Sequence, residues 1–275
     1  MRRQIPGLLY CMLLNGVLRT RWSSGFVFNL IASTFTTSTM ASPNGKVCPK
    51  VVLFGDSITQ GSFEEGGWGA AAANVLQRKC DVLNRGLSGY NSRWAEILLP
   101  HILPLDLLKQ THLVTVFFGA NDASLPDVTP DKYVSVEDYA ANLKKIVEHL
   151  KTGGLKSDQI ILICPPAFYG DDWKKVCIEK GTELNRSNEN TGQYSRACCQ
   201  VAKDLKTHVI DLWTIMQEDK NWKRYLCDGL HLSVDGSQLL WEHLKPFFDK
   251  LAESLEMVYP DWSSIDPKNP EASLL

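Results

Sequence analysis

The sequence has little that would suggest a nucleic-acid or membrane protein. Its 275 residues carry 29 basic and 31 acidic side chains, for a net charge of −2, and they form no basic stripe of the kind that contacts nucleic acid. No apolar run approaches the roughly 20 residues that a membrane-spanning helix needs. The composition, 44% hydrophobic and 22% charged, is otherwise that of an ordinary globular protein. We therefore expect neither a nucleic-acid partner nor an integral membrane segment.

The cysteine pattern also lacks a disulfide or zinc framework. Cys11 lies near the N-terminus, and the other seven contain no C-x-x-C pair: Cys48, Cys80, Cys164, Cys177, Cys198, Cys199 and Cys227. We expect several of them to be small buried apolar side chains, which mildly favours a reducing compartment. Asp56 and Asp122 have no histidine or further carboxylate at ligand spacing. The sequence therefore predicts no metal site.

Acidic residues are absent from the first 55 positions. Arginines and many serines and threonines fill residues 1–39, a composition that resembles an organelle transit peptide. Two alternatives stay open, a secretory signal with an interrupted apolar core at residues 8–18, and an extension without a targeting role. If residues 1–39 are a transit peptide, we expect import into a mitochondrion or plastid. If they have no targeting role, we expect a cytoplasmic protein. We consider secretion the less favoured alternative.

The chain divides into three parts by composition. We expect residues 1–48 to be a targeting-like or disordered leader and residues 49–256 to be one folded domain. Residues 257–275 are rich in proline, serine and aspartate, and we expect them to be a loose tail. Nothing in the sequence predicts the oligomeric state.

Strand-like apolar runs alternate with helix-like segments through the predicted domain. The predicted strands are residues 51–54, 81–84, 113–118, 159–164 and 208–211, and the predicted helices are residues 68–79, 93–103, 136–151, 183–205 and 235–255. Most of the strands are continuously apolar, as expected of parallel strands that are covered on both faces. This alternation predicts an α/β fold, a three-layer α/β/α sandwich around a five-stranded parallel sheet.

Four polar motifs follow predicted strands or precede the last predicted helix. They contain Ser57 in Gly-Asp-Ser, Gly89 in residues 84–93, Asn121 in residues 117–122, and the pair Asp228 and His231. Ligands of open α/β sheets bind outside the carboxyl ends of the strands, so Ser57 is well placed to be a nucleophile. Each motif alone is an ordinary turn or helix cap; the case for a site depends on their occurring together.

Acyl transfer assigns a task to each of these residues. A serine hydroxyl needs a base, which His231 supplies, and Asp228 three residues earlier can hold the other ring nitrogen. The charge on the tetrahedral intermediate needs fixed donors. We expect these oxyanion donors to be the backbone amides of Ser57 and Gly89 and the side-chain amide of Asn121.

The four motifs together resemble the GDSL, or SGNH, hydrolase superfamily, whose four letters match Ser57, Gly89, Asn121 and His231. Residues 54–60, 84–94, 117–123 and 228–233 are similar to the isoamyl acetate-hydrolysing esterase subgroup, including its plant members. The resemblance covers about residues 50–255, and Ile58 in place of the family's leucine is its one departure in the first motif. It implies a flavodoxin-like sandwich that hydrolyses a small ester through an acyl-enzyme, with no cofactor.

Three functions compete on these residues. The first is a serine esterase acting on small acyl esters as small-molecule substrates. The second is a carbohydrate O-acetylesterase or acyltransferase that uses the same site. The third is a non-catalytic binding protein, against which the intact Ser57, Asp228 and His231 argue. Tyr90, Phe168 and Tyr169 are candidates to line the substrate pocket, because they belong to loops at the same edge as Ser57.

Overall fold

The computed structural model describes residues 13–14, 17–18 and 48–274. Two short strands, β1 (Leu13–Leu14) and β2 (Val17–Leu18), pair antiparallel in a sheet of their own. The rest of the predicted leader up to residue 47 lies outside the described residues, and its role stays a prediction. Within the described ranges, no helix is long and apolar enough to cross a membrane.

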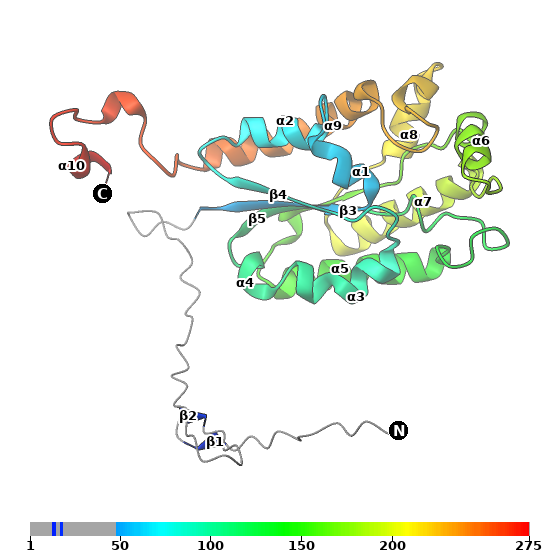
Figure 1. Cartoon of the computed structure of the whole chain (residues 1–275), viewed down its shortest axis with the longest axis horizontal. Coiled ribbons are helices and arrows are strands. Elements are labelled where there is room, and N and C mark those ends of the chain that lie inside the picture. The colour runs from blue at the N-terminus through cyan, green and yellow to red at the C-terminus, as the bar shows by residue number, and fades with distance from the viewer. Residues whose placement is uncertain (1–12, 15–16, 19–47, 275) are drawn as a thin grey trace, which may run out of the picture. The chain divides into compact units, whose positions relative to one another are not determined.

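The domain is built on one parallel sheet (Figure 1). Its strands are β3 (Lys50–Gly55), β4 (Asp81–Gly86), β5 (Thr111–Phe117), β6 (Ile160–Ile163) and β7 (His208–Ile210), in the order β4-β3-β5-β6-β7. Every pairing is parallel. The predicted five-stranded parallel sheet is confirmed, and each predicted strand lies within three residues of an observed one.

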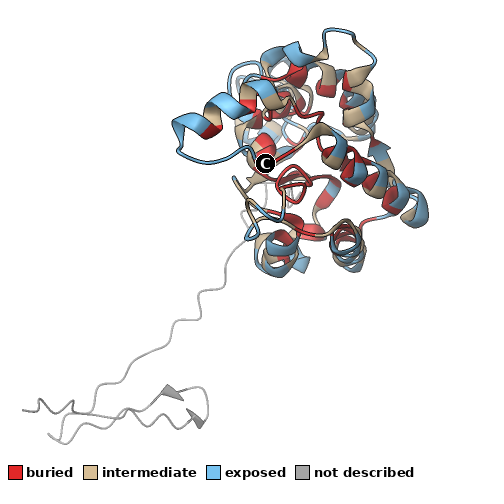
Figure 2. Cartoon of the chain, turned by 90° about the vertical axis from the view of Figure 1, so that its right-hand side faces the viewer, coloured by how far each residue is buried: buried red, intermediate tan, exposed pale blue. Residues whose placement is uncertain are grey.

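Helices cover both faces of this sheet and produce three layers. One layer holds α1 (Ser57–Gln60), α2 (Trp68–Val75), α6 (Gly170–Glu179), α8 (Leu212–Gln217) and α9 (Val234–Ser254), and the other holds α3 (Ser92–Ile102), α4 (Leu105–Leu108), α5 (Val136–Thr152) and α7 (Asn188–Leu205). Side chains of β3 alternate between the layers, with Val51 and Leu53 in one apolar core and Val52 and Phe54 in the other. Apart from Lys50 and His112 near their starts, the residues of the central strands β3, β5 and β6 are buried, and buried residues are red in Figure 2. This burial accounts for their apolar runs.

One predicted helix boundary is wrong, at the start of α7, and one observed helix before it was not predicted. The helix predicted over residues 183–205 begins only at Asn188, because the Ser187 side chain caps it by accepting from the Asn190 amide. Residues 183–187 are therefore non-helical. Arg186 in this segment contacts the loop after β5, where its Nε donates to the Ala120 carbonyl. The structure also adds α6, which was not predicted. The remaining short helices are η1 (Gly61–Phe63), η2 (Ser157–Gln159), η3 (Trp222–Tyr225), η4 (Trp262–Ser264) and α10 (Pro270–Leu274).

The C-terminal residues that were expected to form a loose tail are tied to the domain at their start. The Val258 amide donates to the Arg78 carbonyl over 2.8 Å, and Arg78 Nη2 donates to the Pro260 carbonyl over 2.6 Å. Arg78 also pairs with Asp261 over 3.3 Å. Val258 is buried, so the folded part extends a few residues past the predicted boundary at 256.

Candidate active site

Ser57 is the first residue of α1 and follows β3 with only Asp56 between them. Asp56 caps the helix, since its Oδ1 accepts from the Ile58 amide over 3.0 Å. A strand that turns at once into a helix presents the serine hydroxyl at the carboxyl end of the sheet. This is the position that the sequence predicted for Ser57.

The structure brings Ser57, His231 and Asp228 into one chain of hydrogen bonds. Ser57 Oγ lies 2.9 Å from His231 Nε2, and His231 Nδ1 lies 2.7 Å from Asp228 Oδ2. Asp228 Oδ1 also accepts from the amides of Leu230 and His231. With Nδ1 held by a carboxylate, the neutral ring carries its proton there and leaves Nε2 free to accept from serine.

Asp228 is suited to remain ionised beside the histidine. Burial alone would raise the pKa of this carboxyl, but the hydrogen bonds from the His231 ring and amide, together with the histidine's charge, outweigh it and hold the pKa below its usual value. An imidazolium formed at His231 would therefore face a full negative charge 2.7 Å away.

The three predicted oxyanion donors belong to neighbouring loops of the same edge. Gly89 has φ +80°, a left-handed conformation that other residues adopt at a cost. The amides of Ser57 and Gly89 donate to no acceptor within the described part of the chain. Asn121 Nδ2 donates one hydrogen to the Tyr90 carbonyl over 3.0 Å and keeps a second one. The three groups follow the neighbouring parallel strands β3, β4 and β5, so they belong to loops at the same edge of the sheet.

The Asn121 motif is fastened to the Gly89 motif through Asp122. The buried Asp122 carboxylate accepts from the Ser92 amide at 2.9 and 3.1 Å and from the Ser92 hydroxyl. Burial raises the pKa of Asp122 to about 6, although the Ser92 hydrogen bonds act in the opposite direction. Asp122 thus holds two loops together, and within the part of the chain that the structure describes it has no hydrogen bond to Ser57, His231 or Asp228.

Arg186 is part of the site, although the sequence analysis did not identify it. It is 4% exposed, and its Nη2 donates to Asn121 Oδ1 over 3.0 Å. Its guanidinium lies 5.4 Å from the ring centre of Trp173, whose indole packs edge-on against the His231 ring with centres 6.0 Å apart. No sequence signal could have identified Arg186, because it stands in a segment that was predicted to be helical.

A pocket of about 350 Å³ opens beside the triad. It is lined by Ser57 and His231 and by mostly polar neighbours from the α1–η1 segment, the Gly89 motif and the start of α9: Ile58, Gln60, Gly61, Ser62, Glu64, Ser88, Cys227, Leu232 and Ser237. The aromatic residues expected to line the substrate pocket, Tyr90, Phe168 and Tyr169, are not among the residues that line this cavity. Phe168 is a core residue, Tyr169 packs on Trp222, and Tyr90 packs on Trp94.

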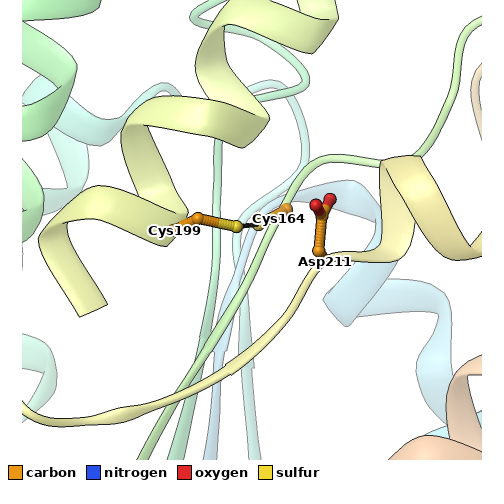
Figure 3. Close-up of side chains that lie close together, drawn as sticks. All are labelled: Cys164, Cys199 and Asp211. Atoms are coloured by element: carbon orange, nitrogen blue, oxygen red, sulfur yellow. Dashed lines mark hydrogen bonds between the residues drawn. The ribbon is translucent and has the colours of Figure 1, made fainter. Parts of the chain in front are cut away.

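One group of side chains in the described ranges has the composition of a metal site (Figure 3). Cys164 and Cys199 lie with their sulfurs 3.5 Å apart, close to Asp211. Asp211 already accepts from the Ser195 hydroxyl and from the amide and hydroxyl of Thr214 as the cap of α8. Contact with a neighbouring thiol and burial raise the pKa of both cysteines, which keeps them protonated. The group shares no residue with the triad, and its carboxylate is engaged in capping.

Comparison with known proteins identifies the family of the chain. The family model for the GDSL-like lipase/acylhydrolase family matches residues 53–239. The isoamyl acetate-hydrolyzing esterase 1 homolog of Rattus norvegicus is 49% identical over 86% of this chain and 95% of its own length. A GDSL esterase/lipase of Arabidopsis thaliana is 41% identical over 81% of this chain and 96% of its own.

Solved structures extend the comparison to the fold. A lipase/acylhydrolase from Enterococcus faecalis superposes with a TM-score of 0.58 at 24% identity, covering 76% of this chain and 98% of its own. An acetylxylan esterase from Geobacillus stearothermophilus superposes with a TM-score of 0.56 at 23% identity, covering 74% and 96%. The family-model match and the two close relatives show that this chain belongs to the GDSL family of ester hydrolases.

Proposed function

We propose that this GDSL-family ester hydrolase cleaves small carboxylic esters through an acyl-enzyme formed on Ser57. The observation that carries the proposal is the hydrogen-bonded chain from Ser57 Oγ through the His231 ring to Asp228. A serine hydroxyl is unreactive at neutral pH without such a base. The pairing also argues against a non-catalytic binding protein, which has no need of it.

In the acylation step, Ser57 Oγ attacks the ester carbonyl carbon while its proton passes to His231 Nε2. The tetrahedral intermediate then collapses, the bond to the alkoxy oxygen breaks, and the same proton goes from Nε2 to the departing alcohol. Asp228 holds the imidazolium during this interval. Deacylation repeats the sequence with water as the nucleophile and releases the carboxylic acid.

The oxyanion of both intermediates would be bound by the amides of Ser57 and Gly89 and by Asn121 Nδ2. Two rigid backbone donors and one fixed side chain need no rearrangement when the charge develops, which is the source of their catalytic value. The side chain of His231 is 34% exposed, so water can reach the acyl-enzyme.

The pocket favours small or polar substrates. A volume of about 350 Å³ admits a short acyl or alcohol group, and Gln60, Glu64 and Ser88 line its wall. This polar wall supports the second candidate, a carbohydrate O-acetylesterase, because it offers partners to the hydroxyl groups of a sugar. The names of the relatives refer to isoamyl acetate, and that of one fold neighbour to acetylxylan.

Two measurements test the proposal. The first is the turnover of p-nitrophenyl esters of increasing acyl length beside isoamyl acetate and acetylated xylo-oligosaccharides; we expect acetyl and short acyl esters to be preferred. The second is labelling with a fluorophosphonate followed by peptide mass mapping, with Ser57→Ala as the control. The acyl-enzyme is supported if the wild type is labelled on Ser57 and if Ser57→Ala loses both the label and the activity. Unchanged activity in Ser57→Ala would overturn it.

A further inference from the structure

Arg186 is a buried cation without an ion pair among the described residues. Burial lowers its pKa to about 10, so it is still charged at neutral pH. Burying a charge is costly unless hydrogen bonds compensate for it. Here three neutral oxygens do so, and each belongs to or adjoins the site. A charge kept at this cost beside the proposed oxyanion hole needs an explanation.

The three acceptors place the guanidinium behind Asn121. Nε donates to the Ala120 carbonyl over 2.8 Å, Nη1 to Asn185 Oδ1 over 2.8 Å, and Nη2 to Asn121 Oδ1 over 3.0 Å. Ala120 and Asn121 are adjacent, so the planar guanidinium holds both the main chain and the side chain of this turn. A single ammonium group cannot reproduce this forked contact.

The Asn121 amide is thereby held from both ends. Its oxygen accepts from Arg186, and one of its amide hydrogens goes to the Tyr90 carbonyl. Rotating the amide by 180° would place its NH₂ group against the guanidinium and its oxygen against a carbonyl, so both contacts would become repulsive. Only one orientation survives, and in it the second hydrogen of Nδ2 stays available.

We propose that Arg186 is a positioning residue, which fixes and polarises the Asn121 amide as an oxyanion donor. A cation bonded to the amide oxygen draws electron density from nitrogen and makes Nδ2–H a stronger donor. The gain is largest when the substrate oxygen carries negative charge, so Arg186 acts on turnover more than on substrate binding. This inference rests on the proposed function, in which Asn121 is an oxyanion donor.

The test is a double-mutant cycle measured as kcat and KM on a p-nitrophenyl ester. Asn121→Ala should lower kcat by about 10²–10³-fold. Arg186→Met should lower kcat by about 10–100-fold, as for other groups that orient a functional side chain, with KM changed by less than about twofold. The double variant should be no slower than Asn121→Ala alone, because Arg186 has nothing left to position.

Asn190→Ala is the matched control. Asn190 Nδ2 donates to the Ala123 carbonyl over 2.8 Å and so links the same two segments without touching Asn121. We expect it to lower the melting temperature and leave kcat unchanged. If Arg186 only anchored the loop, Asn190→Ala would mimic Arg186→Met, and the losses from Arg186→Met and Asn121→Ala would multiply. Either result would overturn the inference.

Arg186→Lys keeps the test valid if Arg186→Met does not fold. Lysine retains the charge but reaches fewer acceptors, so its kcat should lie between those of the wild type and Arg186→Met, and its loss should also vanish in the Asn121→Ala background. Failure of the inference is distinguishable from failure of the proposed function. An active Ser57→Ala overturns the function, whereas an inactive Ser57→Ala beside a fully active Arg186→Lys overturns only the role of Arg186.

Discussion

At the scale of single residues, Asp228 accepts three hydrogen bonds, from the His231 ring, the His231 amide and the Leu230 amide. An asparagine keeps the shape but loses the charge and can offer NH₂ to the ring, which imposes the wrong tautomer. We expect Asp228→Asn to lower kcat by as much as about 10⁴-fold with little change in KM. Steady-state kinetics measure this, and circular dichroism checks the fold. A loss confined to KM would assign Asp228 to substrate binding.

A second prediction at this scale concerns Asp56. It is 1% exposed, its Oδ2 has no hydrogen-bond partner among the residues that the structure describes, and burial raises its pKa to about 7. The Ile58 amide and the charges of His231 and Arg186 oppose this rise, and Asp122 adds to it. Because the folded state holds the proton more tightly than the unfolded state, this carboxyl stabilises the fold at acidic pH. The contribution is lost as pH rises from about 4 through 7.

Asp56→Asn should remove this pH dependence, because an amide resembles the protonated acid and does not titrate. We expect the free energy of unfolding of the wild type, measured relative to Asp56→Asn by urea denaturation, to fall by a few kcal/mol between about pH 4 and pH 8. The Asp122 carboxyl is present in both proteins and cancels to first order. A wild type that instead gains stability over this interval would mean that Asp56 is ionised in the folded protein.

At the scale of elements, the position of the loop before α9 depends on its close contact with the start of α6. Gly229 has φ +90°, and a Cβ there would lie 2.3 Å from the Tyr169 carbonyl oxygen and 2.7 Å from the backbone nitrogen of Trp173. The Tyr169 amide also donates to the Gly229 carbonyl over 2.9 Å. The unpredicted helix α6 therefore supports the loop that carries Asp228 and His231.

Gly229→Ala should push the loop before α9 away from the start of α6, and Gly154→Ala is its control. Gly154 also has positive φ, +106°, but a Cβ there would meet nothing within 4 Å. We expect Gly154→Ala to cost about 1 kcal/mol of stability with unchanged kcat. Gly229→Ala should cost more and should also lower kcat, because backbone atoms must shift beside the triad. Thermal melting and ester turnover measure both. Equal kcat in the two variants would show that α6 does not set the position of the loop.

Most of the regular elements could be predicted from the sequence, whereas the contacts of the irregular segments between them could not. The sheet and the positions of Ser57, Gly89, Asn121 and His231 were predictable, because apolar strands end in distinct polar motifs and parallel strands bring their ends to one edge. Arg186 and the polar pocket wall were not. Their contacts depend on how non-helical segments fold back across the sheet edge, and such segments have no periodic signal.

At the scale of the whole molecule, every strand of the domain sheet lies between residues 50 and 210. We therefore expect a shortened chain that starts at Met40 to fold, melt at the temperature of the full chain and show the same kcat on a p-nitrophenyl ester. Parallel purification, melting and kinetics of the two proteins test this. Lower kcat or melting temperature in the shortened chain would mean that leader residues contribute to the fold.

Cys227 lines the pocket next to Asp228; the residue is exposed as a whole, although its sulfur is partly buried. Burial of its sulfur and the charge of Asp228 raise its pKa, so little thiolate exists at neutral pH. The pocket proposed for the substrate thus contains a thiol that alkylating reagents should modify fastest in mildly alkaline buffer, where more thiolate is present. A fluorophore or spin label attached to Cys227 would report when the pocket is occupied. Treatment with maleimides or iodoacetamide should block the pocket, so such preparations should be checked for alkylation of Cys227.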